Sequence, residues 1–195
     1  YAMEGSIFIA GAGVQWLRDR MKFFKKASET EKLVKSLKDN NNIYLVPAFT
    51  GLGAPHWDAN ARGVLTGITR DTSPKEIVRA TIEAVAYQTY DLFEAMKHDG
   101  LRPKIVKVDG GMVMNNWFSQ FLSDIVNVKV LRPKVQETTA VGAAFMAGLQ
   151  IGVYKSLKDI SKIWHLDKKF SPKMKNNSRT KLLKGWTSAI KRTLI

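Results

Sequence analysis

The chain of 195 residues contains no cysteine, and this absence excludes disulfide bridges and cysteine-ligated metal sites. Its three histidines, at positions 56, 98 and 165, lie far apart in the sequence. No apolar run approaches the roughly 20 residues of a membrane-spanning helix. Residues 1–5 have neither the basic start nor the apolar stretch of a secretory signal. We therefore expect a cytoplasmic protein without a membrane span. Because the chain begins at Tyr1 rather than Met, we expect the C-terminal part of something longer.

Acidic residues are scarce, since 17 Asp and Glu face 31 Lys and Arg, and the net charge is +14. The excess is local. Residues 151–195 hold 12 basic and 2 acidic residues, or +10, which leaves +4 for the rest. Such a segment could bind nucleic acid or an acidic membrane, or it could be a solvated helical appendage. Its lysines are dispersed singly and arginine is scarce, which favours the appendage and no nucleic-acid partner.

Hydrophobic periodicity predicts an α/β domain with a mostly parallel sheet. The expected helices cover residues 6–20, 28–38, 74–98, 114–126 and 138–151. The expected strands cover residues 43–46, 63–69, 104–109 and 128–132, and a Pro/Gly-rich loop spans 47–62. Residues 156–195 are expected to form one or two amphipathic helices around a break at Phe170-Ser171-Pro172.

Two of these helices begin with recognisable capping signals. Ser28 is followed by Glu31 three residues later, which is the spacing of a capping box. Ser73-Pro74 combines an N-cap residue with proline at the first helical position. We therefore expect helix starts at both places.

The sequence Val108-Asp109-Gly110-Gly111 joins an expected strand to an expected helix. Adjacent glycines permit backbone angles that a side chain forbids. They also let a ligand approach the main chain at a helix N-terminus, where free N–H groups favour phosphate. A plain turn is the alternative, but the position between strand and helix favours a nucleotide site.

Small residues are dense in the expected helix 138–151, at Gly142, Ala143, Ala144, Ala147 and Gly148. Glycine inside a helix costs about 1 kcal/mol relative to alanine, so its presence suggests that something approaches closely. Either the sheet or a ligand could do so. We expect tight packing of this helix on the sheet.

The string Pro-Ala-Phe-Thr-Gly-Leu-Gly-Ala-Pro-x-Trp-Asp begins at Pro47. This string and several separated motifs resemble the C-terminal nucleotide-binding domain of the FGGY carbohydrate kinases, and the string is typical of the branch that phosphorylates glycerol. Other sugar kinases of the family share only its Pro-x-Trp-Asp core. Further matches lie at residues 1–5, 11–19, 63–83, 109–111, 139–144 and 185–189. The resemblance therefore covers essentially the whole chain.

The resemblance implies an actin-like, ribonuclease-H-like ATPase domain in which helices flank a mixed sheet. This domain would be the C-terminal one of two that face each other across a cleft. We expect residues 1–152 to form the ATPase core and residues 153–195 to form a basic helical appendage packed on it.

With its missing N-terminal domain, the chain would belong to an enzyme that converts glycerol and ATP to sn-glycerol 3-phosphate, and that enzyme is expected to be a homo-oligomer. Two other classes remain open. One is another FGGY sugar kinase, such as a pentulose kinase, against which the stretch Thr50 to Gly53 argues. The other is a non-catalytic module that binds nucleotide or nucleic acid.

Nucleotide contacts are implied at four positions of this chain, with two neighbours as further candidates. The four are Gly11, Gln15, Gly111 and Asn115, and the further candidates are Gly110 and Asp109. The alternative role of Gly11 is close helix packing, and that of Asn115 is a helix N-cap. ATP or ADP and Mg²⁺ are the implied cofactors. The aspartate base and the glycerol site are implied upstream, so we expect no catalytic residue and no metal ligand here.

Other polar residues have plainer explanations. An Asx-turn or an ion pair with Arg62 is a better role for Asp58 than metal binding. His56 is expected to anchor its loop rather than to act as a base. Asp109 could orient the glycine turn or approach Mg²⁺ through water. Glu83 could face the cleft or interact within its own helix, and the sequence leaves these alternatives open.

Overall fold

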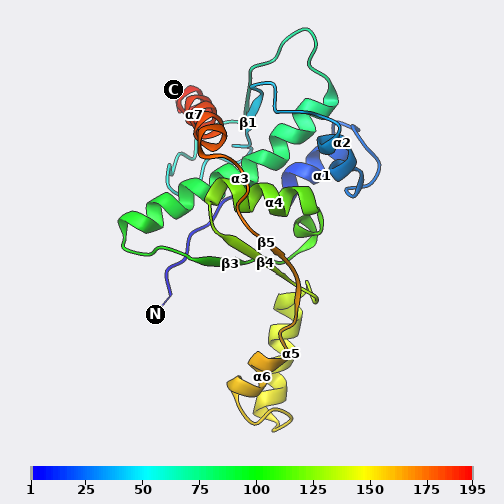
Figure 1. The fold of residues 1–195 in the computed structure, drawn as a ribbon, viewed down its shortest axis with the longest axis vertical. Coiled ribbons are helices and arrows are strands. Elements are labelled where there is room, and N and C mark those ends of the chain that lie inside the picture. The colour runs from blue at the N-terminus through cyan, green and yellow to red at the C-terminus, as the bar shows by residue number, and fades with distance from the viewer. Residues whose placement is uncertain (1, 195) are drawn as a thin grey trace.

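Figure 1 presents the computed structural model of the chain, which describes residues 2–194. Tyr1, the first residue of the family motifs, and Ile195, the last residue of the expected appendage, lie outside the described residues. The helices are α1 (Gly11–Asp19), α2 (Glu29–Lys35), α3 (Pro74–His98), the 3₁₀ turn η1 (Gly111–Met114), α4 (Asn116–Val126), α5 (Thr138–Gln150), α6 (Leu157–Ile163) and α7 (Asn176–Thr193). The strands are β1 (Tyr44–Val46), β2 (Val64–Thr66), β3 (Ile105–Lys107), β4 (Lys129–Pro133) and β5 (Leu166–Phe170).

The strands form two small sheets. β1 pairs with β2 in antiparallel fashion, while the other sheet has the order β3-β4-β5. β3 and β4 are parallel because α4 carries the chain back between them, whereas β4 and β5 are antiparallel. The expectation of a mostly parallel sheet is wrong for the described residues, because the chain leaves β4 through α5 and α6 and returns to it from the opposite direction. The sheet is mixed.

Two elements differ from their expected form. Residues 166–170 form the strand β5 rather than a helix, and only Phe170 at its end is buried. The first helix begins at Gly11 and not at Ser6, because burial alternates with period two from Ser6 to Ile9, as in an extended chain.

Only one of the two capping signals is realised. Ser73 accepts a hydrogen bond from the amide of Lys75, and the Glu76 carboxylate accepts one from the Ser73 amide at 3.0 Å. Ser28 has a helical backbone and makes no capping hydrogen bond, so its expected capping box is wrong. The Glu29 carboxylate instead accepts a hydrogen bond from the amide of Lys26 at 2.7 Å.

The long helix α3 forms the centre of the molecule, and α1, α2, α4 and β1 pack around it (Figure 1). The C-terminal helix α7 also belongs to this core. Its Trp186 is buried, stacks on Tyr87 of α3 with ring centroids 5.3 Å apart, and donates an indole hydrogen bond to Asp91 at 2.6 Å. The C-terminal segment is therefore anchored on the same core that holds the rest of the fold.

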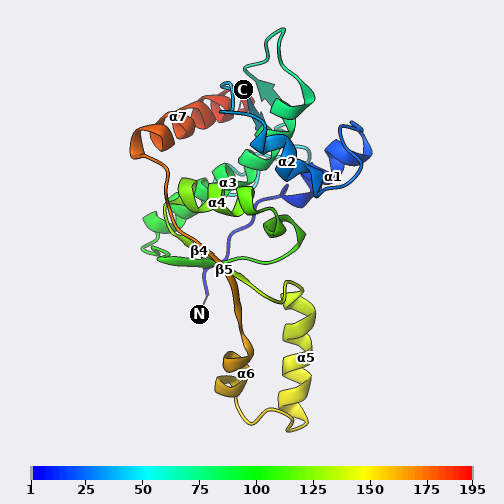
Figure 2. The same ribbon diagram turned by 45° about the vertical axis from the view of Figure 1, so that its right-hand side comes forward.

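Helices α5 and α6 project from this body as an arm (residues 134–165), which Figure 2 shows below the β3-β4-β5 sheet. Gly148 is the only buried residue of α5, and a Cβ there would meet the ring of Tyr154 at 2.7 Å. A Cβ on Gly142 would meet nothing within 4 Å. The expected packing of α5 on the sheet is therefore wrong, since the one close approach comes from the arm itself.

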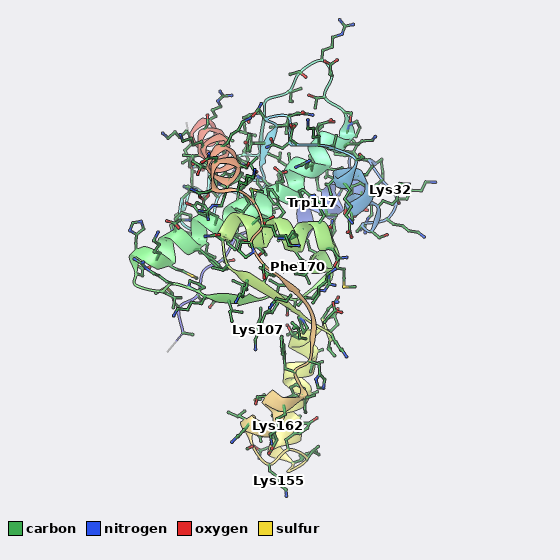
Figure 3. The ribbon with its side chains drawn as sticks, viewed as in Figure 1. Lys32, Lys107, Trp117, Lys155, Lys162 and Phe170 are labelled. Carbon is green, nitrogen blue, oxygen red and sulfur yellow. The ribbon has the colours of Figure 1, made fainter. Side chains whose placement is uncertain are left out.

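Basic side chains of the arm and of the adjoining sheet lie on separate elements. Figure 3 shows Lys155 and Lys162 on the arm, and Lys107 on β3 at the edge of the body. Lys162 pairs with Asp159 at 2.9 Å, and the Lys107 ammonium lies 4.3 Å from the ring centroid of Trp164. Across residues 2–194, no helix combines the length and the apolarity needed to cross a membrane.

Candidate nucleotide-binding site

A cavity of about 410 Å³ opens between α1, α2, α3 and the turn η1. Cavities of this size are typical of small-ligand sites. Its wall contains all four residues at which the sequence implies nucleotide contacts. The lining residues are Gly11, Val14, Gln15, Arg18, Ala27, Ser28, Thr30, Glu31, Ile82, Gly111, Met112, Met114 and Asn115.

Helix α1 supplies one wall through residues that lie on a single helical face. Gly11, Val14, Gln15 and Arg18 follow the spacing i, i+3, i+4 and i+7, which places them on the same side. A Cβ on Gly11 would meet nothing within 4 Å, whereas one on Gly13 would meet Thr81 at 3.0 Å. The close helix packing considered for Gly11 therefore occurs at Gly13. The same spacing could have identified Val14 and Arg18 from the sequence.

The glycine pair after β3 divides into two roles. Gly110 has a φ of 81°, a backbone conformation that side chains rarely adopt. Gly111 begins η1, and a Cβ there would meet nothing within 4 Å. Because Gly111 has no side chain, its main chain is accessible at the cavity wall, while Gly110 allows the turn that leads into η1.

Asp109 and Gly110, the two further candidates, do not line the cavity. The Asp109 carboxylate accepts a hydrogen bond from the hydroxyl of Thr138 at the start of α5. The Gly110 amide donates to the carbonyl of Gln136 at 3.2 Å. Because both groups bond to the segment that follows β4, they orient the glycine turn.

Asn115 caps α4 and also lines the cavity. Its Oδ1 accepts a hydrogen bond from the Phe118 amide at 3.0 Å, so the N-cap role is confirmed. Its Nδ2 donates to the Thr30 hydroxyl at 3.4 Å. Asn115 therefore joins the start of α4 to α2 at the cavity wall.

Glu31 brings a carboxylate to the wall formed by α2. It pairs with Lys35 at 2.5 Å and accepts a hydrogen bond from the Asn116 amide at 3.3 Å. Burial acts to raise the pKa of Glu31, but the hydrogen bonds from Lys35 and Asn116 and the charges of Lys35 and Lys168 together outweigh it and hold the pKa below its usual value. The cavity thus combines an ionised acceptor on α2 with apolar groups from Val14, Ile82 and the methionines of η1. The sequence pattern marked Glu31 only as part of a capping box, and nothing in it marked Thr30.

The remaining polar candidates lie outside this cavity. Asp58 accepts hydrogen bonds from the amides of Asn60 and Ala61 at 2.8 and 3.0 Å, which confirms the Asx-turn. Glu83 is buried and pairs with Arg79 of its own helix at 2.7 Å, so its role is intrahelical. Among residues 2–194, no group of three or more His, Cys, Asp or Glu side chains could hold a metal ion.

Comparison with known proteins places this chain in a family. Residues 1–151 match the model of the FGGY family of carbohydrate kinases, C-terminal domain. The chain is 56% identical over 192 residues to glycerol kinase 1 of Pseudomonas aeruginosa, which covers 98% of this chain and 39% of that relative. It therefore spans about two fifths of the length of such relatives.

Solved structures agree with this assignment. A crystal structure of Plasmodium falciparum glycerol kinase with ADP superposes with a TM-score of 0.87 and 37% identity, covering 98% of this chain and 38% of that one. Ligand-bound xylulose kinase from Lactobacillus acidophilus, at 24% identity and a TM-score of 0.78, covers 96% of this chain and 38% of that one, and shows the fold alone. The actin-like fold class expected from the sequence is confirmed. The chain belongs to the FGGY family of carbohydrate kinases and corresponds to its C-terminal domain.

Proposed function

We propose that the chain is the ATP-binding part of a glycerol kinase, which transfers a phosphoryl group from ATP to glycerol and releases sn-glycerol 3-phosphate and ADP. One observation carries the proposal. Gly11, Gln15, Gly111 and Asn115 come from two distant stretches of sequence and line one cavity. A similar domain occurs in a glycerol kinase whose structure includes ADP.

The cavity offers suitable groups for an adenine nucleotide. Apolar side chains of Val14, Ile82 and Met112 would contact the flat faces of the base. Gly11 and Gly111 have no side chain, and a Cβ at either would face open space, so a ligand can approach the main chain there. These residues bind and orient the nucleotide and leave the chemistry to other groups.

Phosphoryl transfer also needs Mg²⁺, an acceptor site and a group that accepts the proton of the attacking hydroxyl. We place the proton acceptor and the glycerol site in the upstream part of the protein. Mg²⁺ is usually held by one or two carboxylates together with substrate phosphates. The described residues offer no ligand cluster of their own, so we expect Mg²⁺ to arrive with the nucleotide.

A glycerol substrate is favoured over a pentulose. The chain is 56% identical to a glycerol kinase over nearly its whole length, and it retains the Thr50-to-Gly53 stretch of the glycerol branch. A nucleic-acid-binding module is less well supported, because the lysines of the C-terminal segment are dispersed, Lys162 pairs with Asp159, and Lys168 lies over the ring of Phe170.

We further propose that the upstream part covers the arm. Its apolar side chains are unusually exposed, with Ile151 at 76%, Val153 at 65% and Met146 at 51%. The relatives are more than twice as long as this chain, so we expect a domain of the same polypeptide to cover the arm.

We also propose a division into an ATPase core (residues 1–152) and a C-terminal segment (residues 153–195). Phe170 and Trp186 of this segment pack in the core, which supports its attachment to the same domain. Homo-oligomer formation stays a prediction.

Glycerol-dependent ADP production, measured on the complete protein and on this chain alone, tests the proposal. The complete protein should turn over ATP with glycerol and far less with xylulose. The chain alone should bind ADP weakly in calorimetry and show no turnover. Turnover by the chain alone would overturn the placement of the proton acceptor upstream. Salt-sensitive nucleic-acid binding without ADP binding would favour the alternative module instead.

A further inference from the structure

The turn η1 depends on few contacts of its own, although three of its four residues line the cavity. Gly110 precedes it without a side-chain cap, and a 3₁₀ turn of four residues has little intrinsic stability. Within the turn region, the Asn115 amide reaches the Met112 carbonyl at 3.2 Å. Other parts of the chain must therefore hold the turn in place.

Two groups supply that support: the Ser119 hydroxyl of α4, which donates to the Val113 carbonyl at 2.9 Å, and Arg132 of β4. Only 6% of Arg132 is exposed, and its Nη1 donates to the carbonyl oxygens of Val113 at 2.7 Å and Met114 at 3.3 Å. Its Nη2 donates to Oδ1 of Asn116 at 3.3 Å. One guanidinium thus satisfies acceptors at the end of η1 and at the start of α4, and it does so from behind the cavity, which it does not line.

Asp167 of β5 fixes the guanidinium itself. Its Oδ2 accepts a hydrogen bond from Arg132 Nε at 2.7 Å and lies 2.7 Å from Nη2. The side chain of Asp167 is 40% exposed and that of Arg132 is buried, so a carboxylate at the surface pairs with a buried guanidinium. A guanidinium has a rigid planar arrangement of donors, which lets it hold Asp167 and the η1 carbonyls at the same time. A lysine has one terminal nitrogen and cannot span these acceptors in the same way.

We propose that Arg132 is a positioning residue for the nucleotide: oriented by Asp167, it holds η1 where Gly111 and Met112 form the cavity wall. The proposal rests on the proposed nucleotide-binding function. It also gives β5, in the basic C-terminal segment, a role at the site. Arg132 does not itself line the cavity, so its effect on the nucleotide passes through the main chain of η1, including the carbonyl of the lining residue Met114.

The test uses the complete protein with the variants Arg132→Lys and Asp167→Asn. For Arg132→Lys the KM for ATP should rise about three- to tenfold, which corresponds to the net contribution of one ordinary hydrogen bond. The KM for glycerol should stay unchanged. Asp167→Asn should shift the ATP KM in the same direction by less. Asp159→Asn is the matched control, because it removes an acid from an ion pair on α6 away from the cavity, and it should change neither KM.

A purely structural role would lower the melting temperature or the active fraction and leave both KM values unchanged, and that result would overturn the proposal. Equal increases in both KM values would overturn it too. If Arg132→Lys does not fold, the same comparison of the KM for ATP with the KM for glycerol is made on the Asp167→Asn variant, whose substituted side chain is partly exposed. If the wild-type protein fails to phosphorylate glycerol, the proposed function is wrong. The same variants compared by ADP calorimetry would then still decide whether Arg132 positions the nucleotide wall.

Discussion

Two glycines inside helices, Gly142 in α5 and Gly185 in α7, have opposite surroundings. A Cβ on Gly142 would face open space, whereas one on Gly185 would overlap the ring and hydroxyl of Tyr44. Gly142 therefore carries the usual cost of a helical glycine without a packing benefit. Gly185 is required by the close approach of β1 to α7.

The substitution Gly185→Ala should lower the free energy of unfolding by about 2 kcal/mol, because the added methyl group overpacks a buried contact. Gly142→Ala should raise it by about 0.5–1 kcal/mol through helix propensity. Urea unfolding of the two variants measures both effects. Adding Tyr44→Phe should relieve part of the Gly185→Ala loss. A Gly185→Ala variant as stable as the wild type would contradict the packing described here.

Residue motifs predicted part of the site. The four residues implied by the family motifs line one cavity. Arg18 could have been found from its helical spacing to Gly11. Thr30 could not, because its place at the cavity depends on how α2 packs against α4, and no local pattern encodes that. Arg132 lies in an ordinary strand, and its role arises only from tertiary contacts with η1.

At the scale of elements, the start of α3 shows the most complete local signal. The Ser73 side chain accepts a hydrogen bond from the backbone amide of Glu76, and the Glu76 carboxylate accepts one from the backbone amide of Ser73. The Ser73 hydroxyl also donates to the Glu76 carboxylate at 2.6 Å. Burial acts to raise the pKa of Glu76, but hydrogen bonds from Ser73 and from nearby amides outweigh it, and the pKa lies below its usual value. The capping box therefore depends on an ionised Glu76.

A carboxyl whose pKa is lowered by folding stabilises the protein above the pKa it has when unfolded, about 4.3 for Glu, and this stability is lost as pH falls through the folded pKa. Glu76→Gln should reduce stability at neutral pH and flatten the acid dependence of stability below about pH 5. Ser73→Ala should cost about 1 kcal/mol. Urea unfolding at several pH values measures these changes, and an unchanged acid limb in Glu76→Gln would rule out this role.

Other elements were less predictable. The sequence of β5 does not predict a strand, because four of its five residues are exposed and three are charged, so it lacks the alternation of a half-buried strand. The sequence predicts too long a first helix, because Ile7 and Ile9 fit helical spacing as well as they fit an extended segment. Short apolar runs are ambiguous in this way until tertiary contacts are known.

At the scale of the whole molecule, the body and the arm differ in how their apolar surface is used. The body buries large side chains of α3, α4 and α7 around Tyr87 and Trp186. The arm leaves Ile151, Val153 and Leu157 exposed at 63% or more. Exposed apolar groups gathered on a projecting unit are typical of an interface.

If the upstream part of the protein covers the arm, amide hydrogen exchange in α5 should be slower in the complete protein than in this chain alone. The stretch of α3 from residue 78 to residue 88, which is buried within this chain, should exchange at similar rates and serves as the internal control. Hydrogen exchange with mass spectrometry gives both values. Equal protection of α5 in the two forms would contradict this arrangement, and protection that depends on protein concentration would indicate a second copy instead.

The central claim is that the cavity walled by α1 and η1 holds the adenine nucleotide. Gly111→Val tests it most directly, because a Cβ there meets no neighbour within 4 Å, so the valine side chain should enter the cavity without disturbing the fold. Calorimetric titration of the complete protein should show ADP affinity reduced by about tenfold or more, which is about 1.4 kcal/mol, with glycerol binding largely intact. ADP affinity equal to that of the wild type would contradict the claim.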